Sequence, residues 1–326
     1  MNKIIISREL DVILIKFPIW LPIVFLAITK NFEYLYLPCL ILLLFIGELH
    51  FGSTYIFFMD QNYRKQFFDN IYIYTIIPIM IIIFCIIIIL YFSVSSILFL
   101  ILLFNFFHVN RQSIGIFRIF NNSKDSITNK IFEILIYIIS FGLCLIGLLK
   151  FVFKSNFYFN FENEIFYYSN LTILVSSLFI MLITVLRKSF SFNNLFTYLT
   201  GILIFYPVFL TDKLIDIFAI GVSMHYLQYI SITWKIFKIK SKKEVGPDRN
   251  LNHFANLKNI LLLLFSYSFF MIFLSNINVQ YKNENIGIYL IPTFFQLMHF
   301  YFDMFIWRFS NNHTKENLGP FLFAKQ

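Results

Sequence analysis

Residues 71–92 read IYIYTIIPIMIIIFCIIIILYF and contain no charged side chain. A helix needs about 20 predominantly apolar residues to cross the hydrocarbon core of a bilayer, and this stretch is long enough. Residues 131–153 form a second long apolar run. Strands of a membrane β-barrel would alternate apolar and polar residues, whereas these runs are apolar on every face. The sequence therefore predicts membrane-spanning α-helices.

The composition of the whole chain supports this prediction. Of its 326 residues, 59% are hydrophobic and only 13% are charged, whereas a soluble domain carries about 25% charged residues. We expect an all-α, polytopic integral membrane protein that forms one transmembrane helical domain over residues 1–326. About ten transmembrane helices are expected, at residues 12–29, 34–59, 71–92, 94–118, 131–153, 168–187, 191–211, 214–236, 257–275 and 286–309.

The basic residues predict the orientation of these helices. With the N-terminus in the cytoplasm, 20 of the 26 Lys and Arg residues fall on the cytoplasmic side and five on the other, while Lys16 lies within the first span. Cytoplasmic loops carry such an excess of Lys and Arg. We therefore expect both termini in the cytoplasm and a bacterial inner membrane as the location. The same distribution explains the net charge of +9, so no nucleic-acid partner is expected.

Four of the six histidines lie inside predicted spans, namely His50, His108, His225 and His299. Each precedes a charged residue at the predicted cytoplasmic end of its span by nine or ten positions. With a rise of 1.5 Å per residue, each ring would lie ~15 Å from that end, near the middle of the membrane. An ionisable side chain at this depth costs roughly 2.5 kcal/mol or more on insertion scales, so it marks a functional site by default. The shared depth predicts a metal ion held by four imidazoles.

Polar residues follow each of these histidines by one helical turn. On a helix, residues three or four positions apart are neighbours. Metal-bound imidazoles usually donate their second N–H to such a polar group, which fixes the orientation of the ring. Asp303 and Gln228 are therefore expected to orient His299 and His225, and Asp303 is an alternative ligand. The other neighbours are Ser53 and Thr54 after His50, and Arg111 and Gln112 after His108.

Imidazole ligands suit iron, copper, zinc or nickel, so the residue types alone leave the metal open. A histidine-ligated iron centre that opens into lipid suits oxygen chemistry on a hydrophobic molecule, because O2 and such a substrate both concentrate in the bilayer. Two alternatives stay open at this point. One is a transporter or ion-handling protein whose histidines carry protons or metal, and the other is a haem-b electron carrier.

Three segments add a resemblance to a known family. They are residues 49–52 (LHFG), residues 224–229 (MHYLQY) followed by Trp234 and Lys235, and residues 298–308 (MHFYFDMFIWR). They resemble segments of the membrane-bound β-carotene 15,15′-dioxygenases of the Brp/Blh family, although Tyr229 stands where the family has a second histidine. The resemblance implies an all-helical, iron-dependent oxygenase of the dioxygenase type.

Together these observations predict a membrane-embedded oxygenase with a non-haem Fe(2+) ion. The expected partners are O2, membrane lipid and a lipophilic substrate such as a carotenoid, another isoprenoid or a lipid. The expected metal ligands are His50, His108, His225 and His299, with Asp303 and Gln228 supporting catalysis.

Overall fold

The computed structural model describes residues 5–91, 94–121, 126–153, 160–186, 192–211, 219–243, 257–280 and 286–322. These residues contain helices and no strand, as the sequence predicts. The α-helices are α1 (Arg8–Leu10), α2 (Trp20–Asn31), α3 (Tyr36–Phe57), α4 (Gln61–Asp69), α5 (Ile77–Tyr91), α6 (Val94–Phe120), α7 (Ser126–Phe153), α8 (Asn160–Leu186), α9 (Phe192–Ile202), α10 (Gly221–Lys243), α11 (Leu257–Gln280), α12 (Ile286–Ile306), α13 (Asn312–Asn317) and α14 (Gly319–Leu322). The structure also has the π-helices η1 (Asp11–Lys16) and η3 (Tyr72–Ile76) and the 3₁₀-helices η2 (Glu33–Leu35) and η4 (Tyr206–Phe209).

The chain divides into two units. Unit 1 consists of Met1–Leu43 and Phe106–Tyr229, and unit 2 consists of Leu44–Asn105 and Ile230–Gln326. The boundaries fall inside α3, α6 and α10, so each of these three helices contributes residues to both units.

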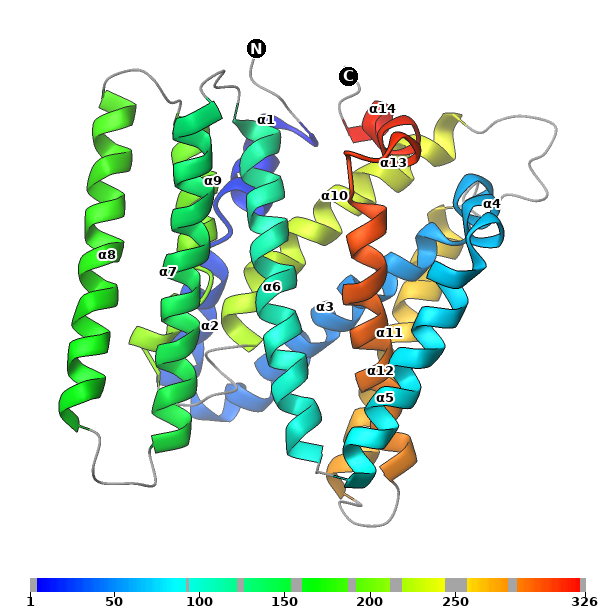
Figure 1. Cartoon of the computed structure of the whole chain (residues 1–326), viewed down its shortest axis with the longest axis horizontal. Helices are drawn as coiled ribbons and strands as arrows, with labels where there is room; N and C mark the ends of the chain where they lie inside the picture. Colours follow the sequence, from blue (N-terminus) through cyan, green and yellow to red (C-terminus); the bar gives the residue numbers. More distant parts are fainter. Residues whose placement is uncertain are drawn as a thin grey trace. The chain divides into compact units, whose positions relative to one another are not determined.

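Unit 1 is built around α7, which packs against α8 and α9 (Figure 1). Its interior is aromatic: the rings of Phe132 on α7 and Tyr198 on α9 lie 5.0 Å apart, and both side chains are buried. Arg118 donates two hydrogen bonds, each 2.6 Å long, to Glu133, which ties α6 to α7.

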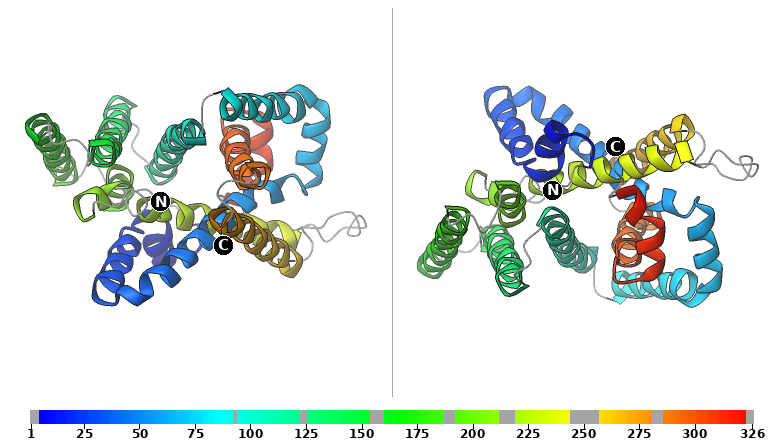
Figure 2. Two further views of the ribbon diagram at one scale, coloured as in Figure 1. Left: turned by 90° about the horizontal axis from the view of Figure 1, so that it is seen from below. Right: turned by 90° about the horizontal axis from the view of Figure 1, so that it is seen from above.

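Unit 2 is built around α12, which packs against α11 and α5, as the end-on views show (Figure 2). The end of α3 joins this unit through aromatic contacts, for example between Phe58 and Phe302, whose rings lie 4.9 Å apart. A buried ion pair joins Lys240 of α10 to Asp60, the residue that caps α4. The sequence predicts that the eighth span ends at residue 236; α10 instead continues to Lys243 and carries Lys240 to this pair.

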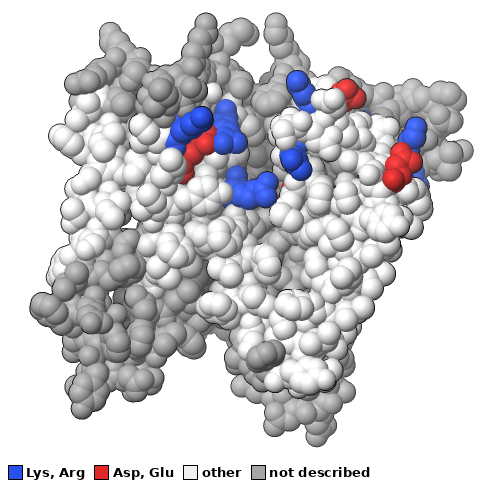
Figure 3. Space-filling view, viewed as in Figure 1, with Lys and Arg blue, Asp and Glu red and all other residues white. Residues whose placement is uncertain are grey.

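Four helices of the described residues are long and apolar enough to cross a membrane: Glu33–Phe57, Tyr72–Tyr91, Asn129–Gly147 and Lys258–Ser275. A bent pair, Arg8–Lys16 with Trp20–Asn31, would make a fifth. On the visible face of each unit, the charged side chains of the described residues lie near one end of the helices, and the described surface below them is uncharged (Figure 3). This supports membrane association. The four or five candidate spans among the described residues do not match the ten that the sequence predicts.

Two of the predicted spans are not continuous helices, and a proline lies at each interruption. The span at residues 12–29 is a pair of helices that bend by 66° around Pro18. The span at residues 191–211 contains only the 11-residue α9, followed by a turn and the 3₁₀-helix that carries Pro207. Proline has no N–H to donate and clashes with the preceding helical turn, so neither segment forms one straight helix.

Aromatic side chains satisfy the carbonyl groups that Pro18 and a further proline, Pro78 in α5, leave open. In a π-helix the carbonyl of residue i accepts from the N–H of residue i+5. Pro18 cannot donate to Ile13, and the indole N–H of Trp20 donates to that carbonyl instead, at 3.0 Å. Pro78 cannot donate to Ile73, and the hydroxyl of Tyr301 on α12 donates to it at 2.8 Å. The second bond also ties α12 to the start of α5.

This role of Tyr301 can be tested by replacing it with Phe. Tyr301→Phe removes the hydroxyl that donates to the Ile73 carbonyl in this part-buried contact, and a carbonyl left without a partner away from water costs about 1–3 kcal/mol. We expect the free energy of unfolding in detergent to fall by about that amount. Tyr72→Phe is the matched control, because Tyr72 lies in the same π-helix with its side chain 71% exposed. Equal stability of the two variants would contradict the assignment.

Candidate metal centre

His50 of α3 and His299 of α12 lie together in unit 2. Both side chains are fully buried. Their ring centroids are 4.4 Å apart, and the rings meet edge to face at 73°. One nitrogen of each ring lies within 4.8 Å of a nitrogen of the other. Two residues that are far apart in the sequence thus offer imidazole nitrogens to one small volume.

A polar side chain from each helix accompanies this pair. The hydroxyl oxygen of Thr54 lies 2.7 Å from Nδ1 of His299 and donates to Oδ1 of Asp303, also at 2.7 Å. Asp303 follows His299 by one turn of α12, but the closest contact between Nε2 of His299 and Oδ2 of Asp303 is 3.8 Å, too long for a hydrogen bond. Asp303 therefore reaches the His299 ring through Thr54.

The two hydroxyl residues that follow His50 have different partners from those predicted. Thr54 contacts His299, on another helix. Ser53 donates at 2.7 Å to the carbonyl of Leu49 in its own helix. A helix in an apolar environment often satisfies a serine in this way, and spacing along α3 alone could not show that Thr54 points to α12.

Aromatic rings enclose the His50–His299 pair. The ring of Phe51 lies 5.3 Å from that of His50 and 5.0 Å from that of His299. Phe51 also meets Phe300 edge to face at 6.3 Å. Apolar walls of this kind lower the local dielectric and strengthen any polar interaction inside.

The other two predicted ligands form a second pair, in unit 1. The rings of His108 on α6 and His225 on α10 are 4.9 Å apart and perpendicular, at 89°. His225 is fully buried, and His108 is partly buried. Each of the four predicted ligands therefore has a histidine neighbour within its own unit. The prediction that all four serve one ion stays a prediction.

Gln228 lies one turn after His225, as predicted, but its side-chain amide has a structural partner. Its Nε2 donates at 2.7 Å to the carbonyl of Ile15, next to the break at Pro18. The hydroxyl of Thr200 donates in the same way to the carbonyl of Lys16, at 2.7 Å. The role of Gln228 in orienting His225 stays a prediction. The contact of Gln228 with the broken N-terminal helix is a finding that the sequence did not suggest.

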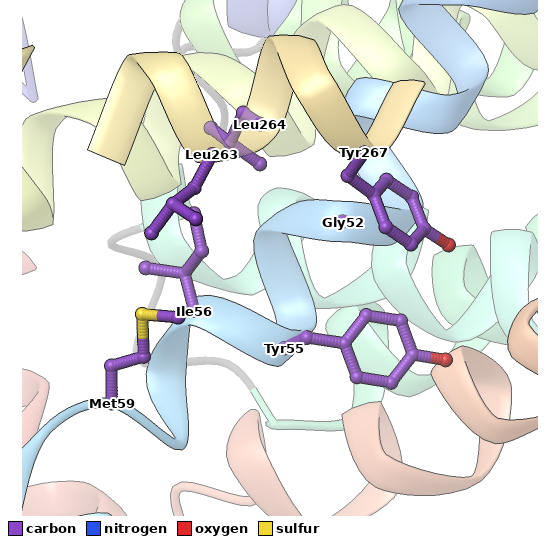
Figure 4. Close-up of a pocket in the computed structure, with 7 residues that line it drawn as sticks. All are labelled: Gly52, Tyr55, Ile56, Met59, Leu263, Leu264 and Tyr267. Atoms are coloured by element: carbon purple, nitrogen blue, oxygen red, sulfur yellow. The ribbon is translucent and has the colours of Figure 1, made fainter. Parts of the chain in front are cut away.

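An apolar groove lies between α3 and α11 in unit 2. Its volume is about 160 Å³, and it is lined by Gly52, Tyr55, Ile56, Met59, Leu263, Leu264 and Tyr267. The rings of Tyr55 and Tyr267 lie side by side at one end, with both hydroxyls pointing away from the aliphatic residues (Figure 4). The hydroxyl of Tyr55 donates to the carbonyl of Phe295, whereas that of Tyr267 is buried with no hydrogen-bond partner among the described residues.

Gly52 determines how closely α3 and α11 approach at this groove. A Cβ atom at this position would lie 2.8 Å from Cδ1 of Tyr267 and 3.2 Å from Leu264. We expect Gly52→Ala to displace the Tyr267 ring and to lower the free energy of unfolding by about 1–3 kcal/mol. The control is Gly115→Ala on α6, where no atom lies within 4 Å of the added carbon, so stability should stay equal or rise slightly. Unfolding in detergent measures both variants, and a neutral Gly52→Ala would contradict the close approach.

Comparisons with protein-family models, curated proteins and solved structures find no match to this chain. The resemblance to the Brp/Blh family therefore rests on the three sequence segments that carry it. Within unit 2 the candidate site consists of the His50–His299 pair, Thr54 and Asp303, and the groove lies in the same unit. Within unit 1 it is the His108–His225 pair.

Proposed function

We propose that this protein is an integral membrane metalloenzyme in which His50, His108, His225 and His299 bind a non-haem Fe(2+) ion. In this proposal it oxidises a lipophilic substrate, an isoprenoid such as a carotenoid or another lipid-like molecule, with O2. The observation that carries the proposal is the pairing of the four rings, each with a histidine from a helix distant in sequence. Buried polar groups that converge in this way mark a functional site more often than a structural one.

The proposal places the histidine-bearing helices in the membrane. His50 lies in Glu33–Phe57, which is long and apolar enough to cross. We propose that α6, α10 and α12, with 27, 23 and 21 residues, cross it as well. The distribution of Lys and Arg supports a cytoplasmic position of both termini and, with it, a bacterial inner membrane.

The donor set fits a redox-active transition metal. Neutral imidazole binds iron, copper, nickel and zinc. A purely structural zinc site would add little stability here, because membrane helices already satisfy their backbone hydrogen bonds internally. When bound, iron would supply the electron transfer to O2. The chain's own part is to hold the imidazoles through α3, α6, α10 and α12, and to keep water away with rings such as Phe51.

The ring geometry disfavours a haem held between the members of either pair. Two axial histidines of a haem lie on opposite faces of the porphyrin, whose plane must fit between them. Here the rings touch at centroid distances of 4.4 and 4.9 Å, which leaves no room for a porphyrin.

The groove between α3 and α11 supports a lipophilic substrate. Both of its helices are long and apolar enough to cross a membrane, so its mouth would open to hydrocarbon. An apolar cavity of about 150 Å³ accepts one ring of the size of benzene. The groove could therefore take a terminal ring or a short stretch of chain, and the Tyr267 hydroxyl in its lining has no hydrogen-bond partner among the described residues.

Metal analysis of the full-length protein tests the proposal. We expect protein purified in lipid nanodiscs and loaded anaerobically with Fe(2+) to retain about one iron per chain, without the Soret absorption of haem. His299→Ala and His225→Ala should each lose the iron, because each removes one ligand. His253→Ala is the control: this histidine lies in a polar stretch outside the described residues and should not affect iron binding.

The outcomes separate the parts of the proposal. Absence of bound metal in the unaltered protein would overturn it. Iron that persists in His225→Ala but not in His299→Ala would overturn the four-histidine centre. Oxygen consumption with isoprenoid substrates in nanodiscs then tests the oxygenase activity, and iron-loaded protein that consumes no O2 with any of them would contradict it.

A further inference from the structure

We propose that Thr54 is a positioning residue that fixes the proton of His299 on Nδ1 and presents Nε2 of that ring to the metal. The metal-binding part of this inference rests on the proposed function. The state of the ring does not, because it follows from contacts within unit 2 alone.

The contacts form a short chain from carboxylate to hydroxyl to imidazole. Oγ1 of Thr54 lies 2.7 Å from Oδ1 of Asp303 and 2.7 Å from Nδ1 of His299. Thr54 and His299 are fully buried, and Asp303 is 5% exposed. A short, buried series of hydrogen bonds of this kind holds its members in fixed positions, because hydrogen bonds are stronger in a low-dielectric interior than in water.

The protons available to these three hydrogen-bonded groups determine which nitrogen of the His299 ring is protonated. A carboxylate only accepts hydrogen bonds, and a threonine hydroxyl has one proton to donate. That proton goes to Asp303, so the hydroxyl oxygen must accept from the imidazole. His299 therefore carries its proton on Nδ1, and the lone pair that can bind a metal is on Nε2.

Asp303 acts on the ring through Thr54 and not directly. Its other oxygen, Oδ2, is 3.8 Å from Nε2 of His299, outside hydrogen-bond range. The carboxylate polarises the hydroxyl, whose oxygen accepts a hydrogen bond from Nδ1–H of the imidazole and so makes Nε2 a better electron-pair donor to a metal. This assigns to Asp303 the orienting role that the sequence predicts for it, with Thr54 as the intermediate.

Ser53 provides a natural comparison. It is the preceding residue of the same helix and is also buried, but its hydroxyl bonds to the Leu49 carbonyl of α3 itself. Loss of the Ser53 hydroxyl therefore tests the general effect of removing a buried hydroxyl from α3. Loss of the Thr54 hydroxyl tests the contact with His299.

The first measurement uses metal-free protein labelled with ¹⁵N in histidine. Solid-state NMR in lipid distinguishes a protonated from an unprotonated ring nitrogen, and comparison with His299→Asn assigns the signals of His299. We expect Nδ1–H in the unaltered protein, in Thr54→Ser and in Ser53→Ala. Thr54→Val keeps the shape of the side chain but lacks the hydroxyl, so we expect the proton to be lost from Nδ1 in part or in full.

The second measurement is the affinity for Fe(2+) of the same four proteins. Removing a group that orients a metal ligand typically weakens metal binding 10–100-fold. We expect a weakening of this size for Thr54→Val and an affinity close to that of the unaltered protein for Thr54→Ser and Ser53→Ala. Recovery in the serine variant separates a positioning role from a general loss of packing.

The two readouts keep the inference separate from the proposed function. A His299 ring protonated on Nε2 in the unaltered protein would overturn the inference, and so would a Thr54→Val variant with unchanged ring state and affinity. If neither the unaltered protein nor any variant binds iron, the proposed function fails. The NMR result still decides whether Thr54 fixes the proton of His299 on Nδ1.

Discussion

Inside a membrane, a polar group has no water to bond with and must find its partner within the protein. Much of the described structure follows from this constraint. The carbonyls released at Pro18 and Pro78 receive hydrogen bonds from Trp20 and Tyr301. The same constraint joins Thr54 to both His299 and Asp303, because none of these groups could be buried alone without a large loss of stability.

The helical class follows directly from the sequence, since runs such as residues 71–92 are apolar on every face. The helix boundaries do not follow in the same way. Pro18 lies at the break between η1 and α2, and Pro207 lies in the 3₁₀-helix that follows α9. Hydropathy alone would continue both helices, because a sliding average over about 20 residues does not register one missing N–H. α10 continues to Lys243, and the partner of its Lys240 is Asp60, 180 residues earlier in the chain, which spacing within one segment does not reveal.

The candidate site could be predicted in part. Four histidines at matched positions in apolar segments predict a shared metal site, and each has a histidine neighbour within its own unit of the structure. Helical spacing placed Thr54 beside His50, but the direction of its hydroxyl depends on which helix packs there, and that helix is α12. Gln228 likewise follows His225 as the spacing indicates, yet its amide is bonded to Ile15. Spacing gives the neighbours within a helix, whereas contacts between helices require coordinates.

The central claim is that imidazoles from distant helices bind one iron ion, and X-ray absorption at the iron edge of the loaded protein tests it most directly. The account predicts the multiple-scattering pattern of several imidazole rings around each iron. A spectrum that shows only oxygen ligands, or the pattern of a porphyrin, would contradict it.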